Sequence, residues 1–149
     1  MAGHRRLREM RQDLTGHFKF SIVRNPYDRF ISLWKVKEAR YNYDLSEFMR
    51  LIELGKYKWY ALQPQSNFLG TKSGILLTQC EAHYERYDSD LNNILESLGL
   101  PRVTFPHFRK GNRAPDYMKY YTNSDQLKFV QKLYKLDFIN FGYSQKETL

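Results

Sequence analysis

The sequence predicts an α/β fold, with a parallel sheet flanked by helices and a C-terminal half that is rich in helix. The first observation is a mostly apolar run at 17–24, which has the length and composition of a buried strand in a parallel sheet. The second is a helical pattern that begins directly after Asn25-Pro26. The third is the order of the later elements: helices, two short candidate strands at 75–78 and 82–86, and more helices.

Local signals mark the elements of the first half. Apolar residues at helical spacing predict a short helix over 5–14, which Gly16 ends. Pro26 suits the first turn of the next helix, where a backbone N–H would have no helical partner. Asp44 is placed to cap a helix over 45–54, and Gly55 to terminate it.

The second half alternates loops and helices. Residues 56–74 are aromatic and polar and are expected to be rich in loops. A helix over 88–98 is followed by Gly99 and Pro101, and the proline-containing segment 101–115 is expected to be a loop. Ser124 is expected to cap a last helix over 125–136, after which 137–143 packs back on the core.

Composition narrows the class of protein. A chain of 149 residues suggests one domain, and 42% hydrophobic residues exclude a disordered chain. The 24 basic and 16 acidic residues give a net charge of +8, which favours anionic partners or makes a solvated basic surface. Cys80 is the only cysteine, so no internal disulfide and no cysteine metal cluster can form, and the four histidines lack metal-ligand spacing.

The cysteine and histidine content therefore predicts no metal site. No membrane segment is predicted either, because no apolar run approaches the roughly 20 residues of a membrane helix. Residues 1–15 are basic but have no apolar core, unlike a secretory signal. Compartment and oligomeric state stay open: a cytoplasm would suit a bacterial chain, and a Golgi membrane a piece of a longer eukaryotic protein. A homo-oligomer would cover an exposed sheet edge.

The junction between the long strand and its helix has the features of a phosphate site. A helix N-terminus offers free backbone N–H groups and a positive dipole to an anion. Arg24 at the strand end can grip a phosphate with its planar guanidinium, and Ser32 can present a hydroxyl from the helix. The alternatives are an ion pair of Arg24 with Asp28, or with a C-terminal carboxylate such as Asp137, and an ordinary helical role for Ser32.

This stretch, Arg24-Asn25-Pro26-Tyr27-Asp28-Arg29-Phe30-Ile31-Ser32, resembles the 3′-phosphate-binding motif Arg-x-Pro-x-x-Arg-x-x-Ser of the sulfotransferase superfamily. The family transfers a sulfuryl group from 3′-phosphoadenosine 5′-phosphosulfate (PAPS), a cosubstrate that leaves as 3′-phosphoadenosine 5′-phosphate (PAP). The match implies that Arg24 and Ser32 bind the 3′-phosphate, while Arg29 supports the turn by pairing with a nearby carboxylate.

Four further segments resemble the carbohydrate branch of that family in consistent order, from about His4 to Tyr143. They are the Pro-Gln-Ser segment at 62–69, the stretch 83–91 with the Leu-Gly element at 98–100, the Pro-His loop at 106–112, and the closing stretch 134–143. The resemblance implies a P-loop-NTPase-like fold and a carbohydrate or other hydroxyl-bearing acceptor. The +8 charge and 16% aromatic residues could also suit a nucleic acid, but the sequence contains no known nucleic-acid module, so no nucleic-acid partner is predicted.

One loop that the resemblance would lead us to expect is not found in the sequence. The family holds the sulfuryl end with an upstream loop similar to Pro-Lys-x-Gly-Thr-Thr, and no such pattern precedes Phe18. The segment 70–74 contains Gly, Lys and Ser but follows no clear strand and opens no helix. Residues 1–149 are therefore expected to be one partial sulfotransferase-like domain whose sheet is incomplete at the N-terminus. A fragment, one part of a split enzyme and a non-catalytic nucleotide-binding remnant remain alternatives.

Several other residues are candidates for the site. Some family members have a histidine in the neighbourhood of His4 that acts as general base on the acceptor hydroxyl. The alternative for His4 is a solvent-exposed side chain close to the chain start. Lys110 and Gly111 could close over the cofactor phosphates or belong to a solvated basic loop.

On the acceptor side, Gln65, Ser66 and Glu85 are the candidate residues. Loop hydrogen bonding would explain Gln65 and Ser66 nearly as well. An ion pair with an arginine is the alternative for Glu85.

Overall fold

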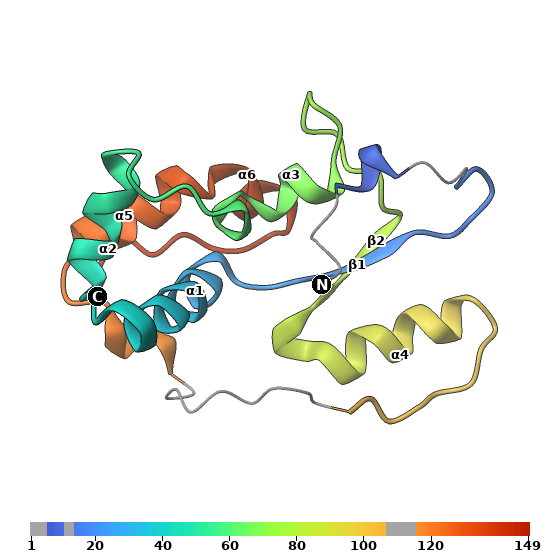
Figure 1. The fold of residues 1–149 in the computed structure, drawn as a ribbon. Coiled ribbons are helices and arrows are strands. Elements are labelled where there is room, and N and C mark those ends of the chain that lie inside the picture. Colours follow the sequence, from blue (N-terminus) through green and yellow to red (C-terminus); the bar gives the residue numbers. More distant parts are fainter. Residues whose placement is uncertain (1–5, 11–13, 107–115) are drawn as a thin grey trace.

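The computed structural model describes residues 6–10, 14–106 and 116–149 and has an α/β architecture (Figure 1). Two strands lie at its centre and helices lie on both sides of them. In chain order the elements are η1 (Leu7–Glu9), β1 (Phe20–Val23), α1 (Pro26–Tyr41), α2 (Leu45–Glu53), η2 (Tyr60–Leu62), α3 (Gln65–Leu69), β2 (Cys80–His83), η3 (Tyr84–Arg86), α4 (Tyr87–Ser97), η4 (Tyr117–Tyr120), α5 (Ser124–Leu133) and α6 (Lys135–Asn140), where η denotes a 3-10 turn.

The two strands pair in parallel, as the sequence predicts, with Phe20 opposite Cys80 and Val23 opposite His83. The connection between them passes through α1, α2 and α3, which is the crossover that parallel strands require. The prediction that β1 is buried is wrong in part. Val23 is fully buried, whereas the side chains of Phe20 and Ile22 are 46% and 45% exposed.

The position of α4 explains this exposure. Paired residues share a face of a sheet, so Ile22 lies on the same face as Ala82. Helix α4 packs on that face through Leu91 and Ile94, which form a small buried cluster with Ala82. The cover extends over β2 but not over Phe20 and Ile22 of β1.

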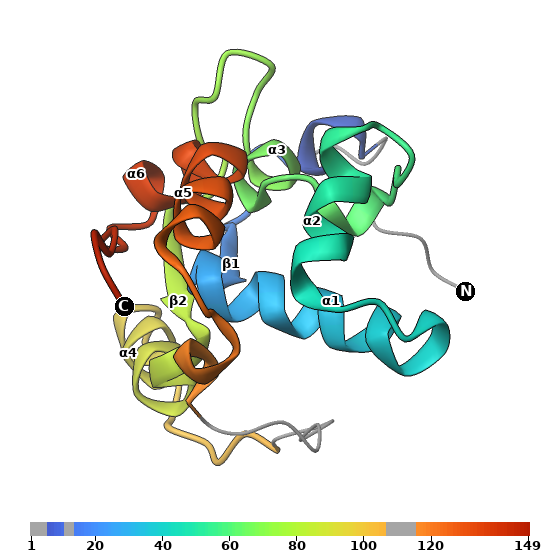
Figure 2. The same ribbon diagram turned by 90° about the vertical axis from the view of Figure 1, so that its left-hand side faces the viewer.

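The main core lies among the helices on the other side of the molecule (Figure 2). Helix α1 contributes Tyr27 and Phe30, which are fully buried. Their rings meet those of Phe138 at 5.0 Å and Phe48 at 5.7 Å between centroids. Edge and tilted contacts of this kind add to the burial of apolar area. The core therefore fixes α1 firmly just behind its first residue.

Some predicted elements differ in detail from the structure. The candidate strand at 75–78 is only a single antiparallel bridge between Gly70 and Leu76, and the candidate strand at 82–86 is β2, displaced to 80–83. Asn123, rather than Ser124, caps α5 by accepting a hydrogen bond from the Gln126 N–H. The last predicted helix is divided into α5 and α6 at a buried, non-helical Tyr134.

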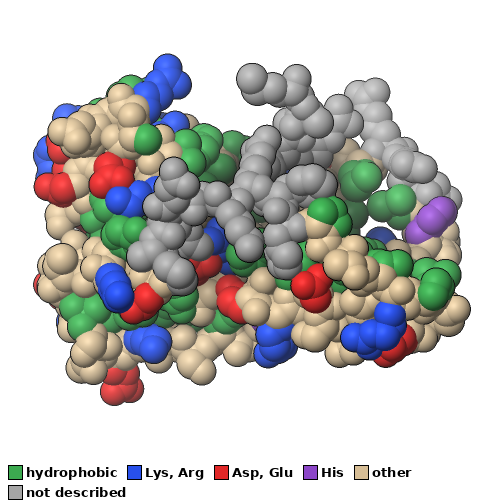
Figure 3. All heavy atoms as spheres, turned by 90° about the horizontal axis from the view of Figure 1, so that it is seen from below, with side chains coloured by type: hydrophobic (Ala, Val, Ile, Leu, Met, Phe, Trp, Pro, Cys, Tyr) green, Lys and Arg blue, Asp and Glu red, His purple; other side chains and the backbone are tan. Residues whose placement is uncertain are grey.

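At the N-terminal end, the predicted helix over 5–14 is represented by η1 alone, and residues 11–13 lie outside the described residues. Within the described part of the chain, no helix is long and apolar enough to cross a bilayer. In the view from below, basic and acidic side chains are interspersed rather than gathered on separate areas of that face (Figure 3).

Candidate functional site

The candidate site lies where β1 ends and α1 begins. Pro26 is the first residue of α1, and the Asn25 side chain caps the helix by accepting a hydrogen bond from the Tyr27 N–H at 3.0 Å. An Asn-Pro pair is suited to this junction, since asparagine is a favoured N-cap and proline needs no partner at the first helical position. The local sequence thus directs the free end of α1 to the carboxyl end of β1.

Arg24 occupies this junction with its side chain held on two sides. Its Nε donates to Asp28 Oδ2 at 2.5 Å, and its guanidinium carbon lies 4.6 Å from the ring centroid of Tyr84. The ion pair with Asp28 is one of the alternatives that the sequence leaves open. The other alternative, Asp137, has different partners: it accepts hydrogen bonds from Gln65 and Ser66.

The environment of Asp28 is unusual for a carboxyl group beside an arginine. The residue is only 5% exposed, and its burial raises the pKa of the carboxyl above its ordinary value. The nearby Glu85 raises this pKa further, while the charge of Arg24 and the hydrogen bond from it act in the opposite direction. Ionised Asp28 is therefore held at an energetic penalty next to Arg24.

Ser32 lies further along α1 and is half-buried. It follows Pro26 by six residues, which places it about 9 Å along the helix axis. Arg24 precedes the N-cap of this helix and Ser32 lies in its second turn, so a ligand that contacts both would lie beside the first two turns.

The backbone of the junction is fixed by side chains from distant parts of the chain. The Arg24 N–H donates to Gln65 Oε1 at 3.0 Å, and Gln65 Nε2 donates to the Arg24 carbonyl at 2.9 Å. The Asn25 N–H donates to Glu85 Oε1 at 2.7 Å, and the Tyr143 hydroxyl donates to Glu85 Oε2 at 2.8 Å. Gln65 and Glu85, two of the predicted acceptor-side residues, thus contact the predicted cofactor-binding segment.

Ser66, the third predicted acceptor-side residue, is buried beneath this junction. Its N–H and its hydroxyl both donate to Asp137 Oδ1, at 2.8 and 2.7 Å, while the Gln65 N–H donates to Oδ2 at 2.7 Å. Asp137 is fully buried and supplies the cap that α3 lacks from its own N-cap residue, Pro64. These contacts hold the start of α3 against α6.

Arg29 supports the turn in a different way from the one expected. Its Nη2 donates to the carbonyls of Ala61 and Gln63, at 2.6 and 2.8 Å, and its guanidinium carbon lies 5.0 Å from the Tyr134 ring centroid. The prediction that Arg29 pairs with a carboxylate is therefore wrong. Backbone carbonyls of the segment before α3 take that place, which links α1 to the region around η2.

The remaining predicted residues, His4, Lys110 and Gly111, lie outside the described residues. Within the described residues, no group of three or more His, Cys, Asp or Glu side chains could hold a metal ion.

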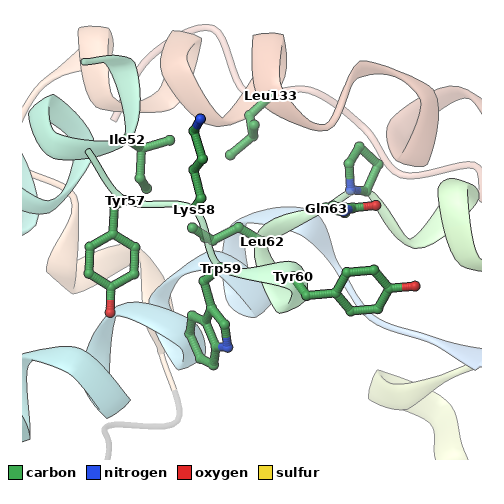
Figure 4. A pocket seen from close by; sticks show the side chains of 9 residues that line it. Ile52, Tyr57, Lys58, Trp59, Tyr60, Leu62, Gln63 and Leu133 are labelled. Atoms are coloured by element: carbon green, nitrogen blue, oxygen red, sulfur yellow. The ribbon is translucent and has the colours of Figure 1, made fainter. Parts of the chain in front are cut away.

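An open groove of about 550 Å³ adjoins the site along the segment before α3 (Figure 4). It is lined by apolar and aromatic residues with one lysine and one glutamine: Ile52, Tyr57, Lys58, Trp59, Tyr60, Leu62, Gln63, Pro64 and Leu133. Behind it, Lys37 Nζ lies 4.2 Å from the Trp59 ring centroid. Sequence reasoning missed the groove, although the cluster of aromatic residues at 57–60 was a visible signal.

Two comparisons of the sequence with known proteins found a match. The family model described as "Sulfotransferase family" matches residues 2–144. The chain is 27% identical over 169 residues to carbohydrate sulfotransferase 11 of Danio rerio, an alignment that covers 88% of this chain and 48% of that protein. The chain thus spans about half the length of this curated relative. No solved structure matches it. With a family model that covers nearly the whole chain, and with the Arg-x-Pro-x-x-Arg-x-x-Ser pattern of residues 24–32 folded at the start of α1, this chain belongs to the sulfotransferase family.

Proposed function

We propose that this chain binds the 3′-phosphate of PAPS, or of its product PAP, through Arg24 and Ser32, and that it takes part in sulfuryl transfer to a carbohydrate hydroxyl. The observation that carries the proposal is the placement of Arg24 at the N-terminus of α1, with both its side chain and its backbone fixed by contacts. A positive dipole end and an oriented guanidinium together favour a phosphate dianion.

Asp28 orients Arg24 for this task. The ion pair uses Nε, so that among the described contacts the two terminal nitrogens of the guanidinium remain as donors to a phosphate. Tyr84 limits movement of the guanidinium on another side. Because the donors are held before the ligand arrives, less conformational entropy is lost on binding.

In the proposed reaction the acceptor oxygen attacks the sulfur of PAPS. A bond forms between that oxygen and sulfur, the bond from sulfur to the bridging oxygen of the phosphosulfate breaks, and PAP leaves with the electron pair. The hydroxyl proton passes to a general base, for which we propose His4. Lys110 and Gly111 are proposed to approach the cofactor phosphates. Charge that develops on the leaving oxygen needs positioned donors.

For the acceptor we propose the aromatic groove. A surface that combines aromatic rings with a few polar groups suits a sugar, whose ring faces are apolar and whose edges carry hydroxyls. Lys58 and Gln63 supply the polar groups. The segment that forms the groove leads directly into Gln65, whose side chain is hydrogen-bonded to the backbone of Arg24. The sugar acceptor and the nucleotide would therefore bind at neighbouring sites.

A nucleotide-binding protein without turnover, or one part of a split enzyme, is the alternative function. Calorimetric titration with PAP tests the binding site shared by these functions. We expect micromolar binding by the wild type, loss of binding in Arg24→Ala, and no change in Arg102→Ala, which removes an exposed arginine paired with Glu96. A folded wild type that does not bind PAP would contradict the proposal. Incubation with PAPS and a carbohydrate acceptor then separates an enzyme from a binding protein.

A further inference from the structure

The carboxylate of Glu85 bridges two segments that lie far apart in the sequence. One oxygen accepts the Asn25 N–H at 2.7 Å, across 60 residues, and the other accepts the Tyr143 hydroxyl at 2.8 Å, across 58 residues. We propose that Glu85 and Tyr143 are positioning residues: they hold the backbone at Asn25 so that Arg24 and the start of α1 keep the geometry that binds a 3′-phosphate. This inference rests on the proposed function.

The Asn25 N–H depends on Glu85 for a hydrogen-bond partner, because neither the strand ladder nor the helix supplies one. The ladder between the two strands ends at Val23, and the first hydrogen bond that involves Asn25 as acceptor belongs to α1. Together with the Gln65 contact to the Arg24 N–H, the Glu85 contact fixes two consecutive peptide groups. A carboxylate that accepts a backbone N–H makes a stronger bond than a neutral acceptor.

Tyr143 in turn keeps Glu85 in place. Its ring lies 5.2 Å from that of His83, at the end of β2, and its N–H donates to the Phe138 carbonyl at 3.1 Å. His83 Nε2 lies 3.0 Å from the Phe141 carbonyl. The C-terminal segment is thus anchored beside the end of β2, and from there Tyr143 reaches the carboxylate that controls the start of α1.

The charge of Glu85 cannot explain a favourable effect on phosphate binding, so its hydrogen bonds must provide it. Glu85 adds a negative charge near a site proposed to bind an anion, and it already raises the pKa of Asp28 by repulsion. Its charge therefore opposes phosphate binding, whereas its hydrogen bonds favour it. A glutamine at this position keeps an oxygen acceptor for the Asn25 N–H and removes the repulsion, so Gln and Ala should behave differently.

The test is the affinity for PAP of a set of variants, measured by calorimetry. We expect Glu85→Ala and Tyr143→Phe to weaken binding by about fivefold or more, which is the effect of one hydrogen bond, and Glu85→Gln to bind at least as tightly as the wild type. Glu96→Ala and Tyr41→Phe are the controls, since Glu96 pairs with an exposed arginine and Tyr41 is 45% exposed, and both should leave the affinity unchanged. Equal losses in Glu85→Gln and Glu85→Ala would overturn the proposal, because they would show that an oxygen acceptor for the Asn25 N–H is not what supports binding.

One ligand-free measurement completes the design. Amide hydrogen exchange at Asn25 should accelerate at least tenfold in Glu85→Ala without any nucleotide present. Unchanged exchange would refute the positioning role. Accelerated exchange in a chain that does not bind PAP would instead refute the proposed function and leave the positioning of the junction intact.

Discussion

Arg24 and Asp28 form an ion pair one helical turn apart at the start of α1, with Nε and Oδ2 separated by 2.5 Å and side chains 19% and 7% exposed. The pair joins a residue of the proposed phosphate site to a carboxyl group whose pKa is raised by burial. The strength of this pair is therefore sensitive to pH in a way that can be measured without a ligand.

We expect Asp28 to make stability fall as pH rises above about 4, the ordinary carboxyl pKa. With a folded-state pKa above that value, the folded chain binds more protons than the unfolded chain in this window, and ionisation then favours unfolding. Urea denaturation of the wild type and Asp28→Asn between pH 4 and about pH 7 measures the effect. The free energy of unfolding of the wild type minus that of the variant should decrease as pH rises.

Asp125→Asn is the control for that experiment. Its side chain is 90% exposed and its contact with Lys128 is on the surface, so the substitution should change the free energy of unfolding only slightly. A wild-type advantage over Asp28→Asn that grows with pH would mean that attraction to Arg24 outweighs burial at this position.

Asp137 should be one of the most sensitive polar positions in the chain. Asp137→Ala leaves two buried donors of Ser66 and one part-buried donor of Gln65 without their acceptor, so we expect a loss of about 3 kcal/mol of stability. Asp137→Asn keeps one acceptor oxygen and should lose less. Chemical denaturation measures both, with Asp125→Ala as the exposed control. A loss below about 1 kcal/mol in Asp137→Ala would show that water replaces the carboxylate.

Neighbouring residues of β1 should differ sharply in their effect on stability. Val23→Ala removes methyl groups from a fully buried site and should cost about 2 kcal/mol. Ile22→Ala removes a larger group from a side chain that is 45% exposed and should cost less than about 1 kcal/mol. Thermal and urea denaturation of the two variants provide the comparison. Equal losses would indicate that the outer face of β1 is covered in solution.

That contrast shows where sequence reasoning was effective and where it was not. The strand at 17–24 and the helix after Pro26 were predicted because apolar composition, an N-cap and a proline at the first turn are local signals. Burial of Phe20 and Ile22 was predicted wrongly, because it depends on whether another element covers them. The position of α4 over β2 alone decides this, and no local pattern records it.

In the candidate site, too, local features could be predicted from the sequence and long-range contacts could not. Arg24 before the start of a helix could be predicted from the motif. The contacts that fix the backbone there come from Gln65, which is 41 residues from Arg24, and from Glu85, which is 60 residues from Asn25. Helix α3 was missed because it has only five residues and is capped by Asp137, 72 residues away from Gln65. Polar contacts across such separations depend on the completed fold, so they appear only in the structure.

The groove allows the acceptor proposal to be tested separately from nucleotide binding. Trp59→Ala removes the largest ring of the groove, so we expect binding to an array of neutral and acidic oligosaccharides to fall at least tenfold. The affinity for PAP should remain within twofold of the wild type, because Trp59 makes no contact with Arg24 or Ser32 among the described contacts. Trp34→Phe is the matched control, as that indole is 6% exposed and donates to the Tyr43 carbonyl away from the groove. Undiminished oligosaccharide binding in Trp59→Ala would exclude the groove as the acceptor site, and a parallel loss of PAP affinity would show that Trp59 supports the fold of both sites.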